Sequence, residues 1–444
     1  MASEEDLLRL PWDWTATTLG DVCDSGAGDI QTGPFGSQLH SADYVSIGVP
    51  SIMPTNITVE GIKAEGIARI TAQDADRLKR YRVRVGDIVY SRRGDVEKCA
   101  LVTASEDAWL CGTGCLRVRL GKANMTPEFL HAYLSSPPIR AWLVRHAVGA
   151  TMPNLNTGIL RSLPLVLPPD DEMRAIGEIW TTLVERTNQL ARSTQTLEAI
   201  ARSIFKSWFV DFDPVRAKAD GREPEGMDAA TAALFPDRFE DLGAGGLPVG
   251  FGRADLESVC SITMGQSPPG NTYNEMGSGI PFYQGRADFT SMYPARRVYC
   301  TAPSRLASEG DVLLSVRAPV GDLNVSLEDC AIGRGVAALR HKSGSTGYTW
   351  CLLKSLESSF ESYDSEGTVF GAIGGKDLKA LKVISPPSNL TDAYTSLCDP
   401  VFSKLRLNEL QIRALADLRD TLLPRLISGK LRVLEAEEML EAVL

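Results

Sequence analysis

Residues 176 to 208 read IGEIWTTLVERTNQLARSTQTLEAIARSIFKSW, a stretch with one glycine and no proline. Apolar side chains recur in it at intervals of seven residues, at Ile176, Leu183, Leu190, Leu197 and Ile204. Because seven-residue spacing keeps an apolar seam on one side of a helix, the stretch predicts a long helix that packs along a partner helix. We expect it to run from about Asp170 to Phe209, or about 60 Å.

A second stretch of this kind lies between about Ser388 and Ile427. One heptad position there holds Tyr394, Val401, Leu415 and Leu422 and is interrupted by Asn408, while another holds Leu405 and Ile412. An Asn within an apolar seam can fix the register of a helix pair. Because the two helices match in length and the chain must return beside its start, we expect them to pack against each other in antiparallel fashion. The alternative is that each packs on a separate globular core.

The segments that precede the two helices repeat one another, roughly 220 to 235 residues apart, which is typical of duplicated domains. Residues 86–94 (GDIVYSRRG) match 310–317 (GDVLLSVR), and both predict a Gly-Asp turn followed by a strand and a basic loop. Each copy ends in a short apolar strand stopped by a proline pair, in LPLVLPP at 163–169 and in LKVISPP at 381–387.

We therefore expect an α/β protein in which two duplicated α/β domains are separated by two long antiparallel coiled-coil helices. A chain of 444 residues is long enough for several folded units. The predicted boundaries are 1–169 for the first domain, 170–210 for the first helix, 211–246 for an acidic linker, 247–387 for the second domain, 388–430 for the second helix and 431–444 for a tail.

The composition is that of an ordinary globular protein, with 43% hydrophobic and 23% charged residues. The net charge is −10, but residues 211 to 246 alone hold 9 acidic against 4 basic side chains, so the domains themselves can present basic surfaces. The sequence has no apolar run long enough to cross a membrane, and its acidic start is unlike a signal peptide. We expect a cytoplasmic protein with no membrane partner and with its nine cysteines reduced.

The sequence lacks the phosphate-binding and dinucleotide-binding glycine motifs, and its four histidines do not show the spacing of zinc ligands. Cys111 and Cys115 lie close together in CGTGC, but no second pair follows at zinc-finger spacing. A weak nuclease-like arrangement of Mg²⁺-binding carboxylates and a lysine is offered by Asp364, Asp377 and Lys379, for which a solvated loop is the alternative. We expect no catalytic residue, metal or cofactor in this chain.

The order of domain, long helix, domain and long helix resembles the specificity subunit of type I restriction-modification enzymes over nearly the whole chain. GPFGSQL at 33–39 is similar to the opening of one class of target recognition domain, and residues 265–273 are similar to that of another. SWFVDFDPVRAK at 207–218 resembles the link that follows the first helix of the family, and LLPRLISGKLRV at 422–433 resembles the end of the second.

The resemblance implies a non-catalytic subunit that recognises a bipartite, asymmetric target in double-stranded DNA. Each domain would read one half-site, and the helix pair would set the separation. The partners implied are two methyltransferase subunits and restriction and translocase subunits, and these would use S-adenosylmethionine, ATP and Mg²⁺. Two other hypotheses stay open: a self-contained nuclease, and an adaptor whose domains bind only protein.

Candidate DNA contacts follow from loop position, because Arg, Asn and Gln read base edges while Arg, Lys and Ser hold phosphates. The candidates in the first domain are Ser37, Gln38, Asn56, Arg92 and Arg93, and those in the second are Gln266, Gln284, Arg286, Arg317 and Lys376. The arginines stand out because both domains place one after the same Gly-Asp strand.

Large aromatic side chains at the helix seams are candidates for a surface that binds partner subunits. They are Trp180, Phe205, Trp208 and Phe209. The alternative is that they complete the core of the seam itself.

Overall fold

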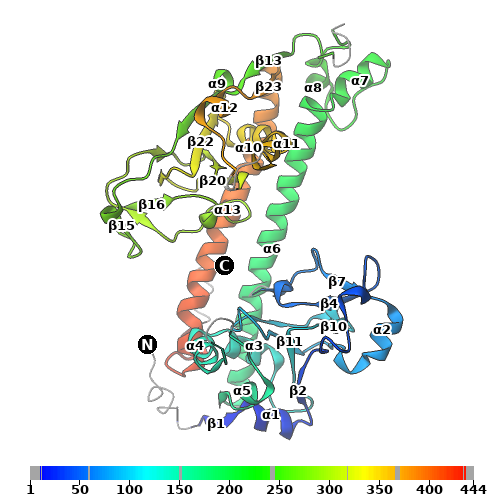
Figure 1. Ribbon diagram of the computed structural model, residues 1–444, viewed down its shortest axis with the longest axis vertical. Coiled ribbons are helices and arrows are strands. Elements are labelled where there is room, and N and C mark those ends of the chain that lie inside the picture. Colours follow the sequence, from blue (N-terminus) through cyan, green and yellow to red (C-terminus); the bar gives the residue numbers. More distant parts are fainter. Residues whose placement is uncertain are drawn as a thin grey trace. The chain divides into compact units, whose positions relative to one another are not determined.

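The computed structural model describes residues 11, 13–58, 61–149, 153–240, 246–317, 319–365, 371–433 and 435–436 (Figure 1). The chain divides into two compact units. Unit 1 is formed by Met1–Leu190 and Gln411–Leu444, and unit 2 by Ala191–Leu410. Among the described residues, no helix is both long enough and apolar enough to cross a membrane.

Unit 1 contains two four-stranded sheets and a closing strand pair. The first sheet is antiparallel and has the order β2 (Asp29–Thr32), β11 (Cys115–Arg119), β8 (Ile88–Ser91) and β9 (Cys99–Leu101). The second has the order β10 (Leu110–Cys111), β4 (Val49–Ile52), β7 (Ala68–Ile70) and β3 (Tyr44–Val45), and in it β10 and β4 are parallel. Antiparallel pairs are also formed by β1 (Thr15–Thr18) with β12 (Pro164–Leu167), and by β5 (Ile57–Thr58) with β6 (Gly61–Ile62).

The helices that complete the body of unit 1 are α1 (Leu19–Ser25), α2 (Ala72–Arg77), α3 (Pro127–Ser135), α4 (Pro137–His146) and α5 (Thr157–Arg161). Helix α3 begins where the Thr126 hydroxyl accepts a hydrogen bond from the backbone N–H of Phe129, with proline in the first turn. Its Phe129, Leu130 and Tyr133 are fully buried and join the core formed with the first sheet.

Unit 2 contains a four-stranded and a five-stranded sheet. The first is antiparallel and has the order β14 (Cys260–Met264), β22 (Val336–His341), β19 (Val312–Val316) and β20 (Val320–Val325). The second has the order β15 (Tyr273–Asn274), β17 (Tyr299–Cys300), β16 (Ile280–Tyr283), β21 (Cys330–Ile332) and β18 (Leu306–Ala307), with β16 and β21 parallel. The closing pair is β13 (Gly252–Asp255) with β23 (Lys382–Ser385).

The shorter helices of unit 2 are α7 (Asp213–Ala219), α8 (Ala229–Ala233), α9 (Leu256–Val259), α10 (Thr346–Lys354), α11 (Glu357–Ser365) and α12 (Gly375–Lys379). Helix α10 packs on the first sheet of this unit, and α11 packs on its edge strand β20 (Figure 1).

The predicted duplication and the α/β fold class are confirmed by the two topologies. Each unit has an antiparallel sheet in which the strands follow one another in the same chain order, a second sheet with one parallel pair, and a closing pair made by its first and last strands. The two proline-stopped segments found in the sequence form the last strand of each unit, β12 and β23.

The repeated Gly-Asp turn plays one structural role in both units. Gly86 and Gly310 adopt φ of 86° and 82°, which favours glycine. Asp87 accepts a hydrogen bond from the backbone N–H of Arg84 and forms an ion pair of 2.6 Å with Arg119 on β11. The equivalent carboxylate, Asp311, accepts from the backbone N–H of Ser308 and pairs with Arg340 on β22, also at 2.6 Å. The motif therefore ties the turn to the neighbouring strand.

The long helices are α6 (Asp170–Phe209) and α13 (Ser388–Ile427), each of 40 residues, with the bounds expected from the sequence. In unit 2 the Asn408 amide donates to the Thr194 hydroxyl at 3.2 Å, and the Tyr394 hydroxyl donates to the Ala201 carbonyl at 2.9 Å. From Thr194 to Ala201 along α6, the contacted residues of α13 run backwards from Asn408 to Tyr394. The helices are therefore antiparallel in this unit. In unit 1 an apolar contact is formed by Ile176, Trp180 and Leu183 with Leu422, Leu423 and Leu426.

The buried His131 of α3 makes stability depend on pH. Burial lowers the pKa of His131 to about 4 from its ordinary value of 6.5, and its Nδ1 lies 2.9 Å from the Trp180 Nε1, which donates to it. Because the unfolded chain binds a proton that the folded chain does not, the free energy of unfolding falls as the pH drops from about 6.5 toward 4. We expect His131→Asn to reduce this dependence in urea titrations while the part due to the similarly shifted pKa of His341 remains, and the exposed His40→Asn to leave it unchanged. An equally steep profile for His131→Asn would contradict this assignment.

Candidate nucleic-acid interface

Loops gather at one end of the first sheet in each unit and form a rim. Rim 1 comprises residues 33–38, 92–94, 112–114 and 153–156, and rim 2 comprises residues 265–268, 317, 333–335 and 371–376. Backbone N–H groups hold each rim together in the same pattern. Rim 1 has bonds from Gly33 to Cys115, from Arg92 to Gly114 and from Leu155 to Arg92, and rim 2 has bonds from Gly265 to Val336, from Val316 to Gly335 and from Ile373 to Val316.

The glycine that opens each rim is required by a close backbone approach. A Cβ atom on Gly33 would lie 2.0 Å from the Gly112 carbonyl oxygen, and one on Gly265 would lie 2.2 Å from the Gly333 carbonyl oxygen. A Cβ atom cannot be accommodated there unless backbone shifts. The glycine-rich loops recognised in the sequence therefore bring two chain segments into contact at the edge of each sheet.

Arg93 and Arg317 occupy equivalent places in the two rims. Arg93 forms an isolated antiparallel bridge with Asn154, and Arg317 forms the same bridge with Ala372. Both side chains are exposed, and within the described part of the chain neither guanidinium has a hydrogen-bond or ion-pair partner. The repeat thus places one available cation at the same point of each unit, as the sequence predicts.

Rim 1 also contains the candidates Ser37, Gln38 and Arg92. Ser37 is exposed. The side-chain oxygen of Gln38 accepts hydrogen bonds from the backbone N–H of Phe35 at 3.2 Å and from the Tyr81 hydroxyl at 2.7 Å, so this oxygen is already occupied within the protein.

Asn56 lies outside rim 1, at the end of the 3₁₀ turn Pro54–Asn56, and is only 5% exposed. Its side-chain oxygen accepts from the backbone N–H of Met53 at 2.9 Å, and its amide nitrogen donates to the Lys63 carbonyl at 3.2 Å. Contact with a base would require these bonds to break, so the geometry favours a structural role for Asn56.

Rim 2 contains the candidates Gln266, Arg317 and Lys376, all exposed. Gln284 is exposed. It lies beside this rim because the carbonyl of the preceding residue, Tyr283, accepts a hydrogen bond from the backbone N–H of Gly333. Arg286 lies on the next turn, where its guanidinium forms an ion pair of 2.7 Å with Asp322.

Sequence reasoning missed Asn154 in rim 1 and Arg334 in rim 2. The Asn154 side-chain oxygen accepts from Arg92 Nε at 3.3 Å, and Arg334 Nε donates to the Ser267 hydroxyl at 3.3 Å. Arg334 lies between two glycines in GRG, at the position of Thr113 in GTG, so alignment of the two repeats over residues 111–115 and 332–336 would have found it. No sequence signal pairs Asn154 with Arg92, since 62 residues separate them.

The aromatic residues proposed for a partner surface are not exposed. Trp180 is 2% exposed in unit 1 and donates to His131. The other three are buried in the core of unit 2, where their rings contact those of Tyr348, Tyr394 and Phe235. They complete the chain's own cores, as the alternative interpretation of Phe205, Trp208 and Phe209 holds.

The structure describes two of the three side chains considered for catalysis, those of Asp377 and Lys379. Asp377 is exposed on α12, and Lys379 lies 3.6 Å from the Glu257 carboxylate, while the Asp364 side chain lies outside the described residues. Burial raises the pKa of Cys111 to about 12 and that of Cys115 well above its ordinary range, which disfavours thiolates. Within the described ranges, no three His, Cys, Asp or Glu side chains are placed to hold a metal ion.

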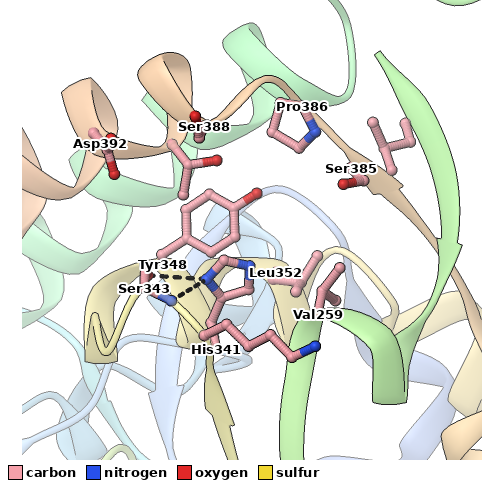
Figure 2. A pocket seen from close by; sticks show the side chains of 12 residues that line it. Val259, His341, Ser343, Tyr348, Leu352, Ser385, Pro386, Ser388 and Asp392 are labelled. Carbon is pink, nitrogen blue, oxygen red and sulfur yellow. Dashed lines mark hydrogen bonds between the residues drawn. The ribbon is translucent and has the colours of Figure 1, made fainter.

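A cavity of about 250 Å³ lies in unit 2, between the end of β22, helix α10 and the start of α13 (Figure 2). His341 and Ser343 bond to each other in its wall, at 2.9 Å between the ring Nδ1 and the hydroxyl oxygen. Burial lowers the pKa of His341 to about 4, so the ring is neutral at pH 7. None of the ten candidate DNA contacts lines this cavity.

Comparison with known proteins identifies the class to which this two-unit fold is related, the DNA specificity proteins of type I restriction-modification systems. Residues 11–200 match the family model described as the type I restriction modification DNA specificity domain. The chain is 25% identical to the putative type I restriction enzyme MjaX specificity subunit of Methanocaldococcus jannaschii, over 96% of this chain and 95% of that protein. It is 23% identical to the type I restriction enzyme HindI specificity subunit of Haemophilus influenzae, over 79% and 87% of the two chains.

The fold is shared with the crystal structure of the type I restriction-modification S subunit from M. genitalium, at a TM-score of 0.55 and 16% identity over 94% of this chain and 96% of that one. The resemblance drawn from the sequence is therefore confirmed: the chain carries a type I restriction-modification DNA specificity domain and is related over its length to type I specificity subunits. These subunits recognise DNA and are not themselves enzymes, and the family carries no cofactor of its own.

The close approach at Gly33 gives a test of how rim 1 is built. We expect Gly33→Ala to destabilise unit 1 by about 1–3 kcal/mol, because its Cβ would collide with a backbone carbonyl. Gly36→Ala in the same loop is the matched control, since a Cβ there meets nothing within 4 Å, and it should change stability by less than about 0.5 kcal/mol. Urea unfolding of both variants measures the difference, and equal stabilities would show that rim 1 does not depend on this approach.

Proposed function

We propose that this chain recognises a bipartite, asymmetric target in double-stranded DNA, with rim 1 reading one half-site and rim 2 the other. The observation that carries the proposal is the equivalent placement of two exposed arginines, Arg93 and Arg317, on two copies of one fold, with no side-chain partner for either among the described residues. Apart from these arginines and the glycines that build each rim, the aligned rim residues differ between the copies. Two rims with the same backbone structure and different side chains suit two half-sites of different sequence.

The proposal assigns the spacing of the half-sites to the two long helices. Helix α6 contributes residues 170–190 to unit 1 and residues 191–209 to unit 2, and α13 is likewise shared between the units. The Asn408 amide, fully buried and bonded to Thr194, is a polar contact that opposes slippage of one helix along the other.

We further propose that the chain works in the cytoplasm and holds two methyltransferase subunits and restriction and translocase subunits on DNA. The names of its relatives, which are subunits of type I restriction enzymes, support this assembly. S-adenosylmethionine, ATP and Mg²⁺ would be bound by those partners. Since the chain carries a net charge of −10, we expect it to bind DNA weakly alone and more tightly within the assembly.

Methylation mapping of DNA from cells that carry the assembled complex tests the proposed function. We expect methylation at one motif with two specific parts separated by unspecified bases. Cleavage of plasmid by the purified chain with Mg²⁺ alone, abolished by Asp377→Ala, would instead establish the nuclease. Assembly of the complex with no footprint on any DNA would establish the protein adaptor.

The two equivalent arginines give a quantitative test. If Arg93 and Arg317 each hold a phosphate, Arg93→Ala and Arg317→Ala should weaken binding of the complex to all DNA sequences alike. Each should also reduce the slope of log affinity against log salt by about 1. Arg238→Ala is the control, because this exposed linker arginine lies in neither rim. Unchanged salt slopes for both rim variants would show that neither Arg93 nor Arg317 contacts DNA.

Matched insertions test the spacing role. Seven residues inserted between Leu190 and Leu197 in α6, and seven between Asn408 and Leu415 in α13, preserve both seams and lengthen each helix by about 10 Å. We expect the methylated motif to keep its two half-sites and to gain about 3 base pairs between them. An insertion in α6 alone should abolish methylation because the seams lose register. A motif of unchanged spacing in the doubly extended variant would refute the role of the helices.

A further inference from the structure

The two rims hold one arginine at the same position and another at different positions. This difference separates two kinds of DNA contact. What the rims share is the exposed cation, Arg93 in rim 1 and Arg317 in rim 2. A residue common to both rims cannot explain how two half-sites differ. It suits the phosphates, which are the same in every half-site.

What the rims do not share is the position of a second arginine, whose Nε is bonded within the protein. In rim 1 this residue is Arg92, whose Nε donates to the Asn154 side-chain oxygen at 3.3 Å and whose guanidinium lies over the Phe35 ring at 5.6 Å. In rim 2 it is Arg334, whose Nε donates to the Ser267 hydroxyl at 3.3 Å.

These two arginines stand at different positions of the common frame. The backbone bonds that Arg92 makes with Gly114 and Leu155 are made in unit 2 by Val316, a buried apolar residue. The bridge position of Asn154 is held there by Ala372. Conversely, Arg334 corresponds to Thr113 of unit 1.

The hydrogen bond at Nε leaves the two Nη groups of each guanidinium available. Within the described residues, the Nη atoms of Arg92 and Arg334 have no hydrogen-bond partner, and both arginines lie at the edge of the sheet, Arg334 exposed and Arg92 half-buried. The backbone around Arg92 is held on both sides, since its N–H donates to the Gly114 carbonyl and its own carbonyl accepts from Leu155. A guanidinium fixed through Nε presents its two Nη groups as a pair of donors in a set direction, which is what two-point recognition of the guanine O6 and N7 requires.

We propose that Arg92 and Arg334 each read one guanine, in different half-sites, with Asn154 and Ser267 as the residues that position them. This assignment rests on the proposed function. It separates base reading by Arg92 and Arg334 from phosphate binding by Arg93 and Arg317. It also explains how one backbone arrangement can recognise two different sequences, because the arginine that reads the base lies at a different position in each rim.

The test uses the complex purified with its methyltransferase subunits and a panel of duplexes in which each base pair of the methylated motif is varied in turn. We expect Arg92→Ala to lower discrimination at one G·C pair of one half-site by about 5- to 150-fold, and Arg334→Ala to do the same at one G·C pair of the other. Discrimination at all other positions should not change. Arg93→Ala is the matched control, which should weaken binding to every duplex alike.

The positioning residues are tested by conservative rescue. Asn154→Ala should reduce discrimination at the same base pair as Arg92→Ala, whereas Asn154→Asp, which keeps an acceptor for Nε, should retain it. The same contrast is expected for Ser267→Ala and Ser267→Thr at the base pair that Arg334 reads. A residue needed only for folding would instead weaken binding to all duplexes in both variants.

The outcomes distinguish a failure of this inference from a failure of the proposed function. Absence of a bipartite motif for the unmodified complex would refute the proposed function. A bipartite motif whose discrimination is unchanged at every position by Arg92→Ala and Arg334→Ala would leave that function standing and overturn the inference. A uniform loss of affinity in these two variants would overturn it too, because it would make them phosphate contacts.

Discussion

The packing of α6 against α13 is the constraint on which the rest of the structure depends. In unit 2 it is antiparallel, and it combines an apolar seam with polar contacts from Asn408 to Thr194 and from Tyr394 to Ala201. In each unit the same helices also belong to the core: Trp180 bonds to His131 of α3 in unit 1, and Tyr394 lies among Phe205, Phe209 and Tyr348 in unit 2. Seam and domain cores are therefore continuous within each unit, so a change in seam register would disturb the domain packed on it.

The two rims show how a duplicated fold keeps its frame while its contacts diverge. The frame is made by backbone, through the close approaches at Gly33 and Gly265, and by one ion pair that recurs between the Gly-Asp turn and the adjacent strand. These features constrain glycine and aspartate and leave the exposed loop side chains unconstrained. The position of a tethered arginine can then differ between the units without cost to the fold.

Much of the architecture followed from the sequence because it rests on periodic or local signals. The heptads predicted both long helices with the bounds that the structure has, and the repeated Gly-Asp and proline-pair motifs predicted two similar domains. The site was less predictable. Asn56 sits in a loop and has a base-reading side chain, yet its polar atoms are bonded to the backbone, whereas Arg334 was overlooked. The exposure of a loop side chain depends on neighbours distant in the chain.

By itself, the sequence determined the two long helices and the strands at the Gly-Asp and proline-pair motifs, that one fold occurs twice, and that both copies carry an arginine after the same strand. These properties depend on spacing along the chain. Only the tertiary structure decided that Trp180 and Phe205 fill cores, that Asn154 holds Arg92 across 62 residues, and that Arg93 and Arg317 are exposed at equivalent places. Such outcomes depend on which distant groups the fold brings within hydrogen-bond or van der Waals distance, and a linear pattern does not encode those distances.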